Sequence, residues 1–337
     1  KKELLKIPGV GPRIATNLLQ KEVLFQAETE LKFIESQEIQ PIFFLDAEYP
    51  YRLRHLPDAP VLLYYKGNTP LNGERIISIV GTRQPSELGL GICEEIVQGL
   101  APFAPVIVSG LAYGIDVTAH RAALRAGLPT IGVLGHGLNR IYPALHRRTA
   151  LDMQEQGGLL TEYASDTEPD REHFPMRNRI VAGMSDAVIV IETKEQGGSM
   201  ITARVANQYN KDVFAVPGRI NDSRSAGCNL LIKSHLANLI ENAQDVLYLL
   251  GWEEAEQHKK HGVQMPLFSA LDEQEQAIFQ CLQDAEDPMH IDRLSRELRL
   301  GIAQIATLLL QLEFKGIVKS LPGKRFALSG NPSNTYL

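Results

Sequence analysis

The stretch Arg75-Ile76-Ile77-Ser78-Ile79-Val80-Gly81-Thr82-Arg83 decides the fold, because a continuous apolar run ends there in a glycine turn. Such a run without polar alternation is typical of a strand that is buried on both faces of a sheet. Helical stretches separate it from four similar runs, which with their turns cover Val106–Asp116, Thr130–Gly137, Ala187–Glu192 and Val213–Gly218. This alternation predicts an α/β fold with a Rossmann-like parallel sheet that is covered by helices on both faces.

The polar turns that follow these strands are expected to share one rim of the sheet, where α/β proteins bind their ligands. The turn after the first strand lacks the Gly-x-Gly-x-x-Gly spacing of a dinucleotide site, and the chain contains no P-loop. We therefore predict no cofactor and, without a cluster of metal-ligating residues, no metal site. The rim residues that could bind a ligand are Arg83, Ser109, Gly110, Arg177, Asn178, Arg179, Gly197, Gly198 and Ser199.

The run Phe174-Pro175-Met176-Arg177-Asn178-Arg179-Ile180 is the strongest indication of what the rim binds. Proline suits the first position of a helix, which would put the two arginines and the asparagine in the first turn, where free amides favour an anion. Two guanidinium groups at that place predict a phosphate clamp. The alternative is a charged helix start whose arginines balance the charge of the acidic run Glu168–Glu172. Since Arg177 and Arg179 point roughly 200° apart on a helix, we expect only one to reach a ligand, with Arg179 slightly favoured.

The first segment, residues 1–40, is predicted to be helical with a sharp interruption at Pro8-Gly9-Val10-Gly11-Pro12. Two glycines two residues apart allow a tight turn whose backbone amides can hold a phosphate without reading a base. The pattern resembles the helix-hairpin-helix motif of non-specific DNA-binding proteins, with Gly9, Gly11 and Arg13 as possible phosphate contacts. An ordinary helical hairpin is the alternative. Because these motifs usually occur in pairs, we expect a second one upstream of Lys1.

Length and composition indicate a soluble globular protein of two or three domains. We divide the 337 residues into the segment 1–40, a Rossmann-like domain at 41–252, a polar linker at 253–270 and a helical module at 271–330. The net charge of −6 argues against indiscriminate nucleic-acid binding but allows a local basic pocket. The scattered cysteines, the absence of a signal peptide and the absence of a long apolar run predict a cytoplasmic protein with no membrane span.

The last module is predicted to be a winged helix. Three helices, at Asp272–Leu282, His290–Arg299 and Ile302–Phe314, precede a hairpin formed by Ile317–Ser320 and Arg325–Leu328. A DNA reader would carry basic or amide side chains on its third helix, yet this helix has no lysine or arginine. We therefore expect a role in protein interaction, or an auxiliary role, rather than base readout.

The motifs of the central block resemble those of the DNA-processing protein A (DprA/Smf) family. They occur in the family's order between Ser78 and Ile232, and the flanking segments also resemble variants of that family, with a helix-hairpin-helix (SAM-like) segment before the sheet and a winged-helix domain after it. The motifs are Ser78–Arg83, Ser109–Asp116, Gly132–Gly137, Tyr142-Pro143, Gly157–Glu162, Phe174–Ile180, Gly197–Ser199 with Thr202-Ala203, Pro217-Gly218 and Gly227–Ile232.

The resemblance implies a bacterial protein of natural transformation that binds incoming single-stranded DNA, protects it, and loads the recombinase RecA onto it. It implies no turnover chemistry. Carried over to matching positions, the family's basic pocket consists of the rim residues named above, and Phe174 is a candidate for base stacking, although an aromatic residue there is more often a core residue.

The resemblance also implies a homodimer that forms through the end of this domain. The residues expected at that contact are Gly227, Asn229, Leu230, Ile232 and Leu236. The chain departs from the family there, because Lys233–Ala237 stands where the family commonly has a Gly-Ala pair.

An enzyme is the rival reading. The Rossmann-like pattern and the Gly-Gly-Ser turn also resemble phosphoribohydrolases of the lysine-decarboxylase-like group, in which Glu192 or Glu195 would have to act as the catalytic carboxylate. His120 and Asp116 share one helix face, but no activated Ser or Cys nucleophile accompanies them. We therefore expect His120 to be structural.

Overall fold

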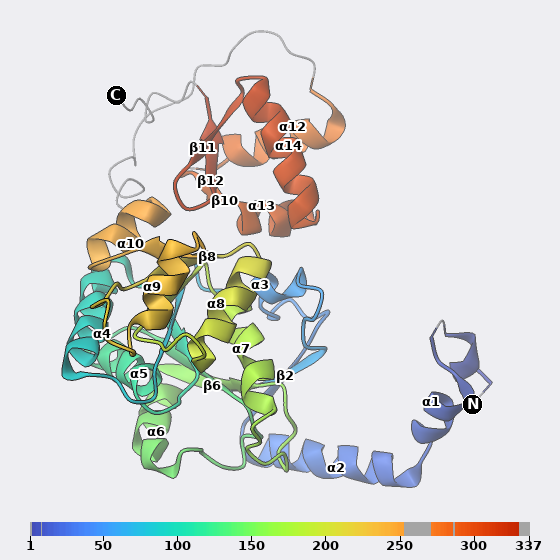
Figure 1. Cartoon of the computed structure of the whole chain (residues 1–337). Coiled ribbons are helices and arrows are strands. Elements are labelled where there is room, and N and C mark those ends of the chain that lie inside the picture. The colour runs from blue at the N-terminus through green and yellow to red at the C-terminus, as the bar shows by residue number, and fades with distance from the viewer. Residues whose placement is uncertain (1, 8, 253–270, 286, 330–337) are drawn as a thin grey trace.

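A nine-stranded sheet forms the centre of the protein in the computed structural model, which describes residues 2–7, 9–252, 271–285 and 287–329 (Figure 1). The strand order is β1-β2-β6-β5-β4-β3-β7-β8-β9. The strands are β1 (Gln40–Phe43), β2 (Leu62–Gly67), β3 (Ile76–Gly81), β4 (Val106–Ser109), β5 (Thr130–Leu134), β6 (Gly157–Thr161), β7 (Ala187–Ile191), β8 (Asp212–Ala215) and β9 (Asn238–Leu239).

The sheet has the winding of a Rossmann-like fold. From β6 to β9 all neighbours are parallel, whereas β1 and β2 add an antiparallel edge. The chain steps outward from β3 through β4, β5 and β6, then returns to β7 on the other side of β3. This reversal places a crevice beyond the carboxyl ends of β3 and β7. The predicted fold class is confirmed, and the five predicted strands are β3, β4, β5, β7 and β8.

Alternate residues of the central strands point to opposite faces of the sheet. Because these residues are apolar, both faces are covered by helices. Val188 and Val190 of β7 pack in one core, and Ile189 packs in the other. The first core is covered by α3 (Tyr51–Arg54), α7 (His173–Met184), α8 (Gly198–Gln208) and α9 (Ala226–Lys233). The second is covered by α4 (Glu87–Leu100), α5 (Ile115–Arg125) and α10 (Ala243–Leu250), while α6 (Arg147–Glu155) packs beside β6.

The segment before the sheet consists of short helical pieces, as predicted. They are η1 (Leu4–Lys6), α1 (Pro12–Asn17) and α2 (Lys21–Ser36). Figure 1 shows α2 running out from the edge of the sheet to α1, which lies apart from the rest. The second half of α2 is anchored, because the Ser165 backbone N–H and hydroxyl donate to Glu30 at 3.0 and 2.6 Å.

The C-terminal module has the winged-helix elements that the sequence predicted. They are α12 (Glu273–Gln283), α13 (Ile291–Leu298), α14 (Ile302–Phe314), β11 (Val318–Leu321) and β12 (Arg325–Leu328), with the additional short strand β10 (Met289–His290). The three strands pair in the order β10-β12-β11. The predicted linker at 253–270 lies outside the described residues.

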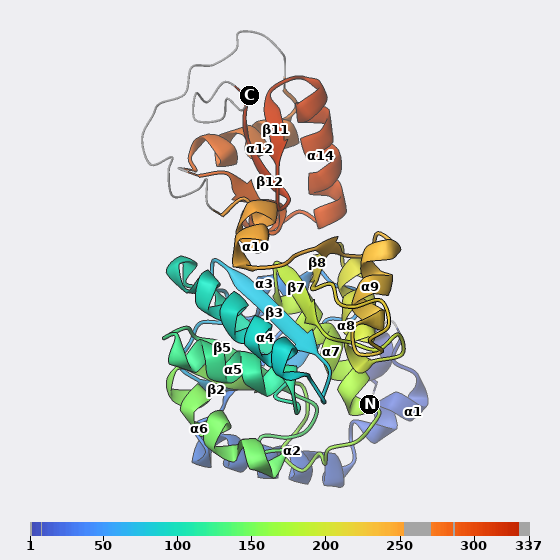
Figure 2. The ribbon, with the colours of Figure 1, turned by 60° about the vertical axis from the view of Figure 1, so that its left-hand side comes forward.

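The winged helix packs on the amino-terminal ends of the parallel strands, at the top of Figures 1 and 2. Lys211, next to the start of β8, forms a buried ion pair with Asp292 of α13 at 2.6 Å. On the sheet side of the same contact, Arg52 pairs with Asp186 at 2.7 Å. The rim that the sequence predicts to bind a ligand lies at the other end of the strands, so the winged helix leaves it uncovered.

Two observations concern the cysteines and the search for a membrane-spanning helix. All three cysteines are free: Cys93 and Cys228 lie in the core, and Cys281 is half-buried. Among the helices that the structure describes, none combines the length and the apolar character needed to span a membrane.

Candidate nucleic-acid interface

The turns after the parallel strands meet at one rim, as expected for strands that run in the same direction. Glycine is required where two of them approach closely. A side chain at Gly81 would bring its Cβ within 2.0 Å of the Ile191 carbonyl oxygen on β7. Gly114, which precedes α5 with a φ of +78°, would bring a Cβ within 2.3 Å of the Thr82 carbonyl oxygen. The rim is therefore held in a compact shape by backbone packing.

Three side chains form a platform on this rim, which we call the rim platform: Arg83, Phe174 and Tyr142. The guanidinium of exposed Arg83 lies 5.5 Å from the centre of the Phe174 ring. Phe174 and Tyr142 stack with ring centres 6.2 Å apart and an angle of 26° between their planes. Tyr142 is 48% exposed, so an aromatic face remains accessible to solvent. Such a group combines a positive charge with surfaces on which a base can stack.

Arg177 lies beneath the platform rather than on it. It is only 4% exposed, and its guanidinium donates hydrogen bonds to the carbonyl oxygens of Gly110, at 2.6 Å, and Val133. These carbonyls belong to the ends of β4 and β5, so Arg177 ties two of the rim turns together. Burial lowers the pKa of Arg177 to about 10, against the attraction of nearby Asp116.

Asp116 is the charged neighbour of Arg177. A Cβ at Gly110 would come within 2.6 Å of an oxygen of Asp116 and 2.5 Å of a nitrogen of Arg177, which places both groups against that glycine. Burial raises the pKa of Asp116, whereas Arg177 and the backbone N–H groups of Ala112 and Gly110 oppose that rise. The pair therefore acts as a buried support for the rim.

Arg179 lies on another side of α7, as its spacing from Arg177 predicted. It forms an ion pair with Glu162 and donates to the Asp58 carbonyl oxygen at 2.6 Å, and its side chain is 12% exposed. Asn178 lies between the two arginines and accepts a hydrogen bond from Nε of Arg177 at 3.2 Å. Neither arginine is thus an exposed cation, and the slight preference for Arg179 over Arg177 stays untested.

The prediction that Pro175 opens the helix was wrong. The helix α7 begins at His173, so Pro175 is its third residue. Proline is tolerated there because the first N–H groups of a helix have no partner within the helix. Arg177 and Arg179 therefore lie in the second turn, away from the free amides that the phosphate-clamp hypothesis required.

The other predicted rim residues divide into buried and open positions. Ser109 is fully buried, and its hydroxyl donates to the Ile79 carbonyl oxygen at 2.6 Å; Gly110 is buried beside it. Ser199 is also buried and donates to the Thr193 hydroxyl at 2.7 Å. By contrast, Gly197 precedes α8 without a side-chain cap, and Gly198 faces open space.

A groove lies beside the platform, at the reversal between β3 and β7, and we call it the rim groove. Its volume is about 730 Å³. Exposed Lys194 and Arg219 give it positive charge, while Arg224 pairs with Asp222 at 3.1 Å. The sequence analysis missed these cations, although Arg219 directly follows the end of a predicted strand. The groove is lined by Thr82, Gln84, Lys194, Arg219, Asn221, Asp222, Ser223 and Arg224.

Glu192, the carboxylate required by the enzyme hypothesis, has a structural role. It accepts hydrogen bonds from the backbone N–H of Ser86, at 2.8 Å, and from the Ser86 hydroxyl. Ser86 is the residue that caps the start of α4, so Glu192 stabilises the positive end of this helix. The second candidate, Glu195, is exposed.

His120 is buried, as expected for a structural histidine. The Thr130 hydroxyl donates to the Ile107 carbonyl oxygen at 2.9 Å, so His120 donates from Nδ1 to the Thr130 oxygen at 2.7 Å. Burial lowers the pKa of His120 to about 3, which keeps the imidazole neutral at physiological pH.

Two sets of predicted residues lie outside the rim, in the N-terminal hairpin and in the expected dimer region, and their roles stay predictions. In the N-terminal hairpin, Gly9 has a φ of +85° and Gly11 precedes Pro12 of α1, and Gly9 and Arg13 are exposed. In the expected dimer region, Asn229 exchanges two hydrogen bonds with the Gly218 backbone, at 3.1 and 3.0 Å. The other residues of that region are Gly227, which is buried, Leu230 and Ile232, which are half-buried, and Leu236, which is exposed.

Comparison with known proteins gives matches over both parts of the chain. Residues 40–251 match the family model of DNA recombination-mediator protein A, and residues 266–324 match that of the DprA winged helix domain. The DNA processing protein DprA of Streptococcus pneumoniae is 43% identical over 67% of this chain and 79% of its own length. Protein Smf of Synechocystis is 34% identical over 87% of this chain and 81% of its own length.

Solved structures agree with these matches. The structure of DprA from Streptococcus pneumoniae aligns with a TM-score of 0.60 at 44% identity, over 63% of this chain and 74% of that protein. DprA from Helicobacter pylori, whose structure was described for its single-stranded DNA binding mode, aligns with a TM-score of 0.58 at 32% identity, over 64% of this chain and 97% of that protein. The chain therefore belongs to the DNA recombination-mediator protein A family, whose members are DNA-processing proteins.

Proposed function

We propose that this protein binds single-stranded DNA along the rim platform and the rim groove, and that it acts as a recombination mediator in natural transformation. The observation that carries the proposal is the accessible group of Arg83, Phe174 and Tyr142 beside a groove with two exposed cations. A relative with this fold, from Helicobacter pylori, is described as binding single-stranded DNA.

The platform favours a single strand over a duplex. Bases stack on aromatic side chains only when their faces are free, and in a duplex they are stacked on one another. The groove suits the backbone of the same strand, because exposed Lys194 and Arg219 can neutralise phosphates without selecting a sequence. We therefore expect weak sequence preference and strong salt dependence.

The structure suggests a division of roles among the predicted rim residues. Arg83 contacts phosphate, Phe174 and Tyr142 stack with bases, and the open backbone at Gly198, at the start of α8, offers an amide to the strand. The buried and half-buried residues act indirectly, by holding the turns in place. They are Ser109, Gly110, Arg177, Asn178, Arg179 and Ser199.

An equilibrium titration with a labelled oligo(dT) tests this proposal. Loss of one charge-assisted contact in Arg83→Ala should weaken binding about tenfold and reduce the slope of log affinity against log salt by about 0.7. The matched control is Arg125→Ala, since Arg125 pairs with Glu94 at 2.8 Å at the end of α5 that is remote from the rim. Unchanged single-strand affinity in Arg83→Ala would refute the rim as the DNA site.

We further propose that the protein protects the bound strand, works as a homodimer and loads RecA onto the strand. The dimer would form through α9 and the edge strand β9, where Leu236 and Leu239 are 37% and 47% exposed. Sedimentation velocity should show a dimer for the wild type and a monomer for Leu239→Lys. A monomeric wild-type protein would contradict the proposed dimer.

RecA loading is tested on DNA that is covered by a single-strand-binding protein. RecA should assemble on this DNA faster when the protein is present, and an unchanged rate would contradict loading.

We infer that the protein binds its substrate without turnover, because Glu192 caps α4 instead of facing a substrate. Incubation with nucleoside monophosphates tests this. Hydrolysis that Glu192→Gln abolishes would favour the phosphoribohydrolase-like alternative.

A further inference from the structure

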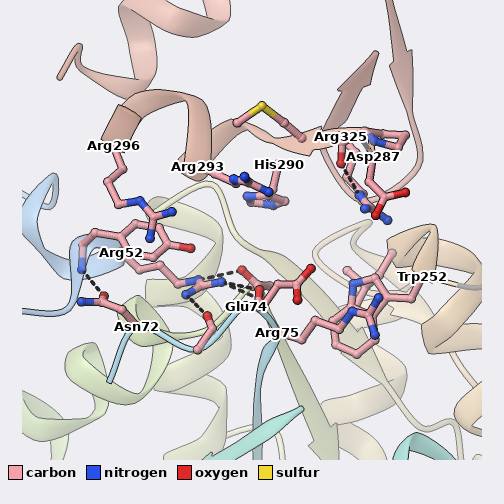
Figure 3. A pocket seen from close by; sticks show the side chains of 17 residues that line it. Arg52, Asn72, Glu74, Arg75, Trp252, Asp287, His290, Arg293, Arg296 and Arg325 are labelled. Carbon is pink, nitrogen blue, oxygen red and sulfur yellow. Dashed lines mark hydrogen bonds and ion pairs between the residues drawn. The ribbon is translucent and has the colours of Figure 1, made fainter. Parts of the chain in front are cut away.

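A cavity of about 200 Å³ lies between the winged helix and the amino-terminal end of the sheet, in a contact that we call the seam (Figure 3). Arginines from both sides line it. Arg52 and Arg75 belong to the sheet side, and Arg293, Arg296 and Arg325 belong to the winged helix. The carboxylates among the lining residues are fewer: Glu74, Asp186 and Asp287.

Three of the five arginines lie within 4.0 Å of a carboxylate oxygen. Arg52 donates from two nitrogens to Asp186, at 2.7 and 3.1 Å. Arg293 donates to Glu297 at 2.9 Å, and the guanidinium of Arg296 lies 4.4 Å from the centre of the Tyr51 ring. Of these contacts, the one between Arg296 and Tyr51 joins the winged helix to the sheet side.

The other two, Arg75 and Arg325, form no ion pair with any carboxylate of the described residues. Arg75 donates to the Phe103 carbonyl oxygen at 3.2 Å, and Arg325 donates to those of Gly251 and Pro288 at 2.6 and 3.1 Å. Burial lowers the pKa of Arg325 and the like charge of Arg75 lowers it further, against the attraction of Asp287 and Glu74. Two cations thus line one cavity without a paired counter-ion.

Two further lining residues carry buried polar atoms that lack a partner within the described part of the chain. His290 accepts the Asp292 backbone N–H on Nδ1 at 3.2 Å, and burial lowers its pKa, so the neutral ring carries its proton on Nε2. That Nε2–H has no acceptor, and Oδ1 of Asp287 has no donor. Figure 3 shows Asp287 beside Arg325.

We propose that this cavity binds inorganic phosphate, held between Arg75 and Arg325. The guanidinium fork matches the oxygens of a tetrahedral oxyanion, and the Nε2–H of His290 supplies a further donor. Near neutral pH phosphate retains a P–OH group in monohydrogen phosphate, and this group can donate to Oδ1 of Asp287. Sulfate has no proton to donate, so the cavity discriminates between the two anions.

Occupation of the cavity has a structural consequence. A phosphate between Arg75 and Arg325 bridges the sheet and the winged helix with charge-assisted hydrogen bonds, and it removes the repulsion between the two cations. The anion therefore strengthens the seam.

Trp252 provides a direct signal for the test, because it is the only tryptophan of the chain and it lines the cavity. The guanidinium of Arg75 lies 5.4 Å from the centre of its ring. Its fluorescence is titrated with sodium phosphate, a nucleoside monophosphate and sodium sulfate at constant ionic strength. We expect a saturable change with phosphate, with a dissociation constant on the order of 1 mM or below, and at least about tenfold weaker binding of sulfate. Binding of the nucleoside monophosphate as tight as that of phosphate would show that a phosphate monoester suffices, and this would overturn the assignment to inorganic phosphate.

Variants separate this site from a general charge effect. Arg325→Gln should weaken phosphate binding at least about tenfold, while Arg125→Gln, at a residue that pairs with Glu94 and does not line the cavity, should leave it unchanged. Asp287→Asn replaces the acceptor with a group that can also donate, so it should abolish the preference for phosphate over sulfate. Because Arg325 also holds two backbone carbonyls, Asp287→Asn is the decisive variant if Arg325→Gln loosens the fold.

Three further results would overturn the proposal. They are the absence of saturable phosphate binding both by fluorescence and by equilibrium dialysis with radiolabelled phosphate, equal affinity for phosphate and sulfate in the wild type, and an unchanged preference in Asp287→Asn.

Discussion

The guanidinium of Arg83 lies 5.5 Å from the centre of the Phe174 ring, although one residue follows β3 and the other belongs to α7. A cation over an aromatic face is held in place by the negative potential of the ring. Because Phe174 also stacks with Tyr142, the charge and the accessible aromatic surface are adjacent. This relationship makes separate predictions for the two side chains.

Replacement of Phe174 by alanine should weaken single-stranded DNA binding about tenfold or more, since a base stacked on an aromatic ring contributes about 1–3 kcal/mol. The salt dependence should stay that of the wild type, because no phosphate contact is lost. Phe174→Tyr keeps the ring and should bind nearly as the wild type does. Phe174 is half-buried, so thermal unfolding of each variant must be compared; wild-type affinity in a folded Phe174→Ala protein would contradict stacking.

Replacement of Arg177 by alanine should destabilise the protein rather than merely weaken DNA binding. The change frees the buried carbonyl oxygens of Gly110 and Val133 and leaves Asp116 without its charged neighbour. Each buried acceptor left without its donor costs about 1–3 kcal/mol. Urea unfolding measures the change, with Arg125→Ala as the exposed control. A loss below about 0.5 kcal/mol, which is typical of surface substitutions, would show that Arg177 does not support the rim.

The stability should fall with acidification in a range that His120 defines. Its pKa is about 3 in the folded protein and about 6.5 when unperturbed, so the unfolded chain binds more protons between these values. The contribution is fully present above about pH 6.5 and is lost towards pH 3, at up to about 1.4 kcal/mol per pH unit. Unfolding free energies at several pH values should show a smaller slope for His120→Gln. An identical slope would contradict a buried neutral histidine.

The ion pair of Lys211 and Asp292 should control docking of the winged helix. Burial alone would raise the pKa of Asp292, but its ion pair with Lys211 holds that pKa well below its usual range. A depressed pKa means that the contribution to stability is present above the ordinary value of about 3.9 and is lost as pH falls below it. The fluorescence of Trp252, monitored down to pH 2–3, should report this loss.

A double-mutant cycle isolates that pair. Lys211→Met and Asp292→Asn should each be strongly destabilising because they leave an uncompensated buried charge or donor, while the combined change should be less harmful than the sum of the two. Strict additivity would show that the two side chains do not interact.

The sequence was sufficient to predict the parallel sheet, because five strands are uninterrupted apolar runs. It did not reveal β6, in which Gly157 and Gly158 weaken the strand pattern. The reason for these glycines is visible only in three dimensions. A Cβ at Gly158 would lie 2.3 Å from the Tyr65 ring on β2, and one at Gly157 would lie 1.9 Å from the Thr130 carbonyl oxygen on β5.

The candidate site could be located from the sequence, but its residues could not be assigned their roles. The spacing of Arg177 and Arg179 indicates that they point apart, yet the burial of Arg177 depends on carbonyl groups of β4 and β5 that are distant in the chain. Likewise, nothing in the sequence indicates that Arg83 and Phe174 contact each other. Their contact depends on the way α7 packs across the sheet.

The two ends of strand β7 lie at different places in the molecule, its start in the seam and its end beside the rim. Asp186, at its start, holds Arg52 in the seam, and Glu192, at its end, holds the beginning of α4 beside the rim. Five residues of extended chain span only about 16 Å. DNA at one pole and a partner on the outward face of the winged helix would thus be carried on opposite sides of the same molecule. Such an arrangement resembles an adaptor, in which each pole can be occupied without steric competition from the other.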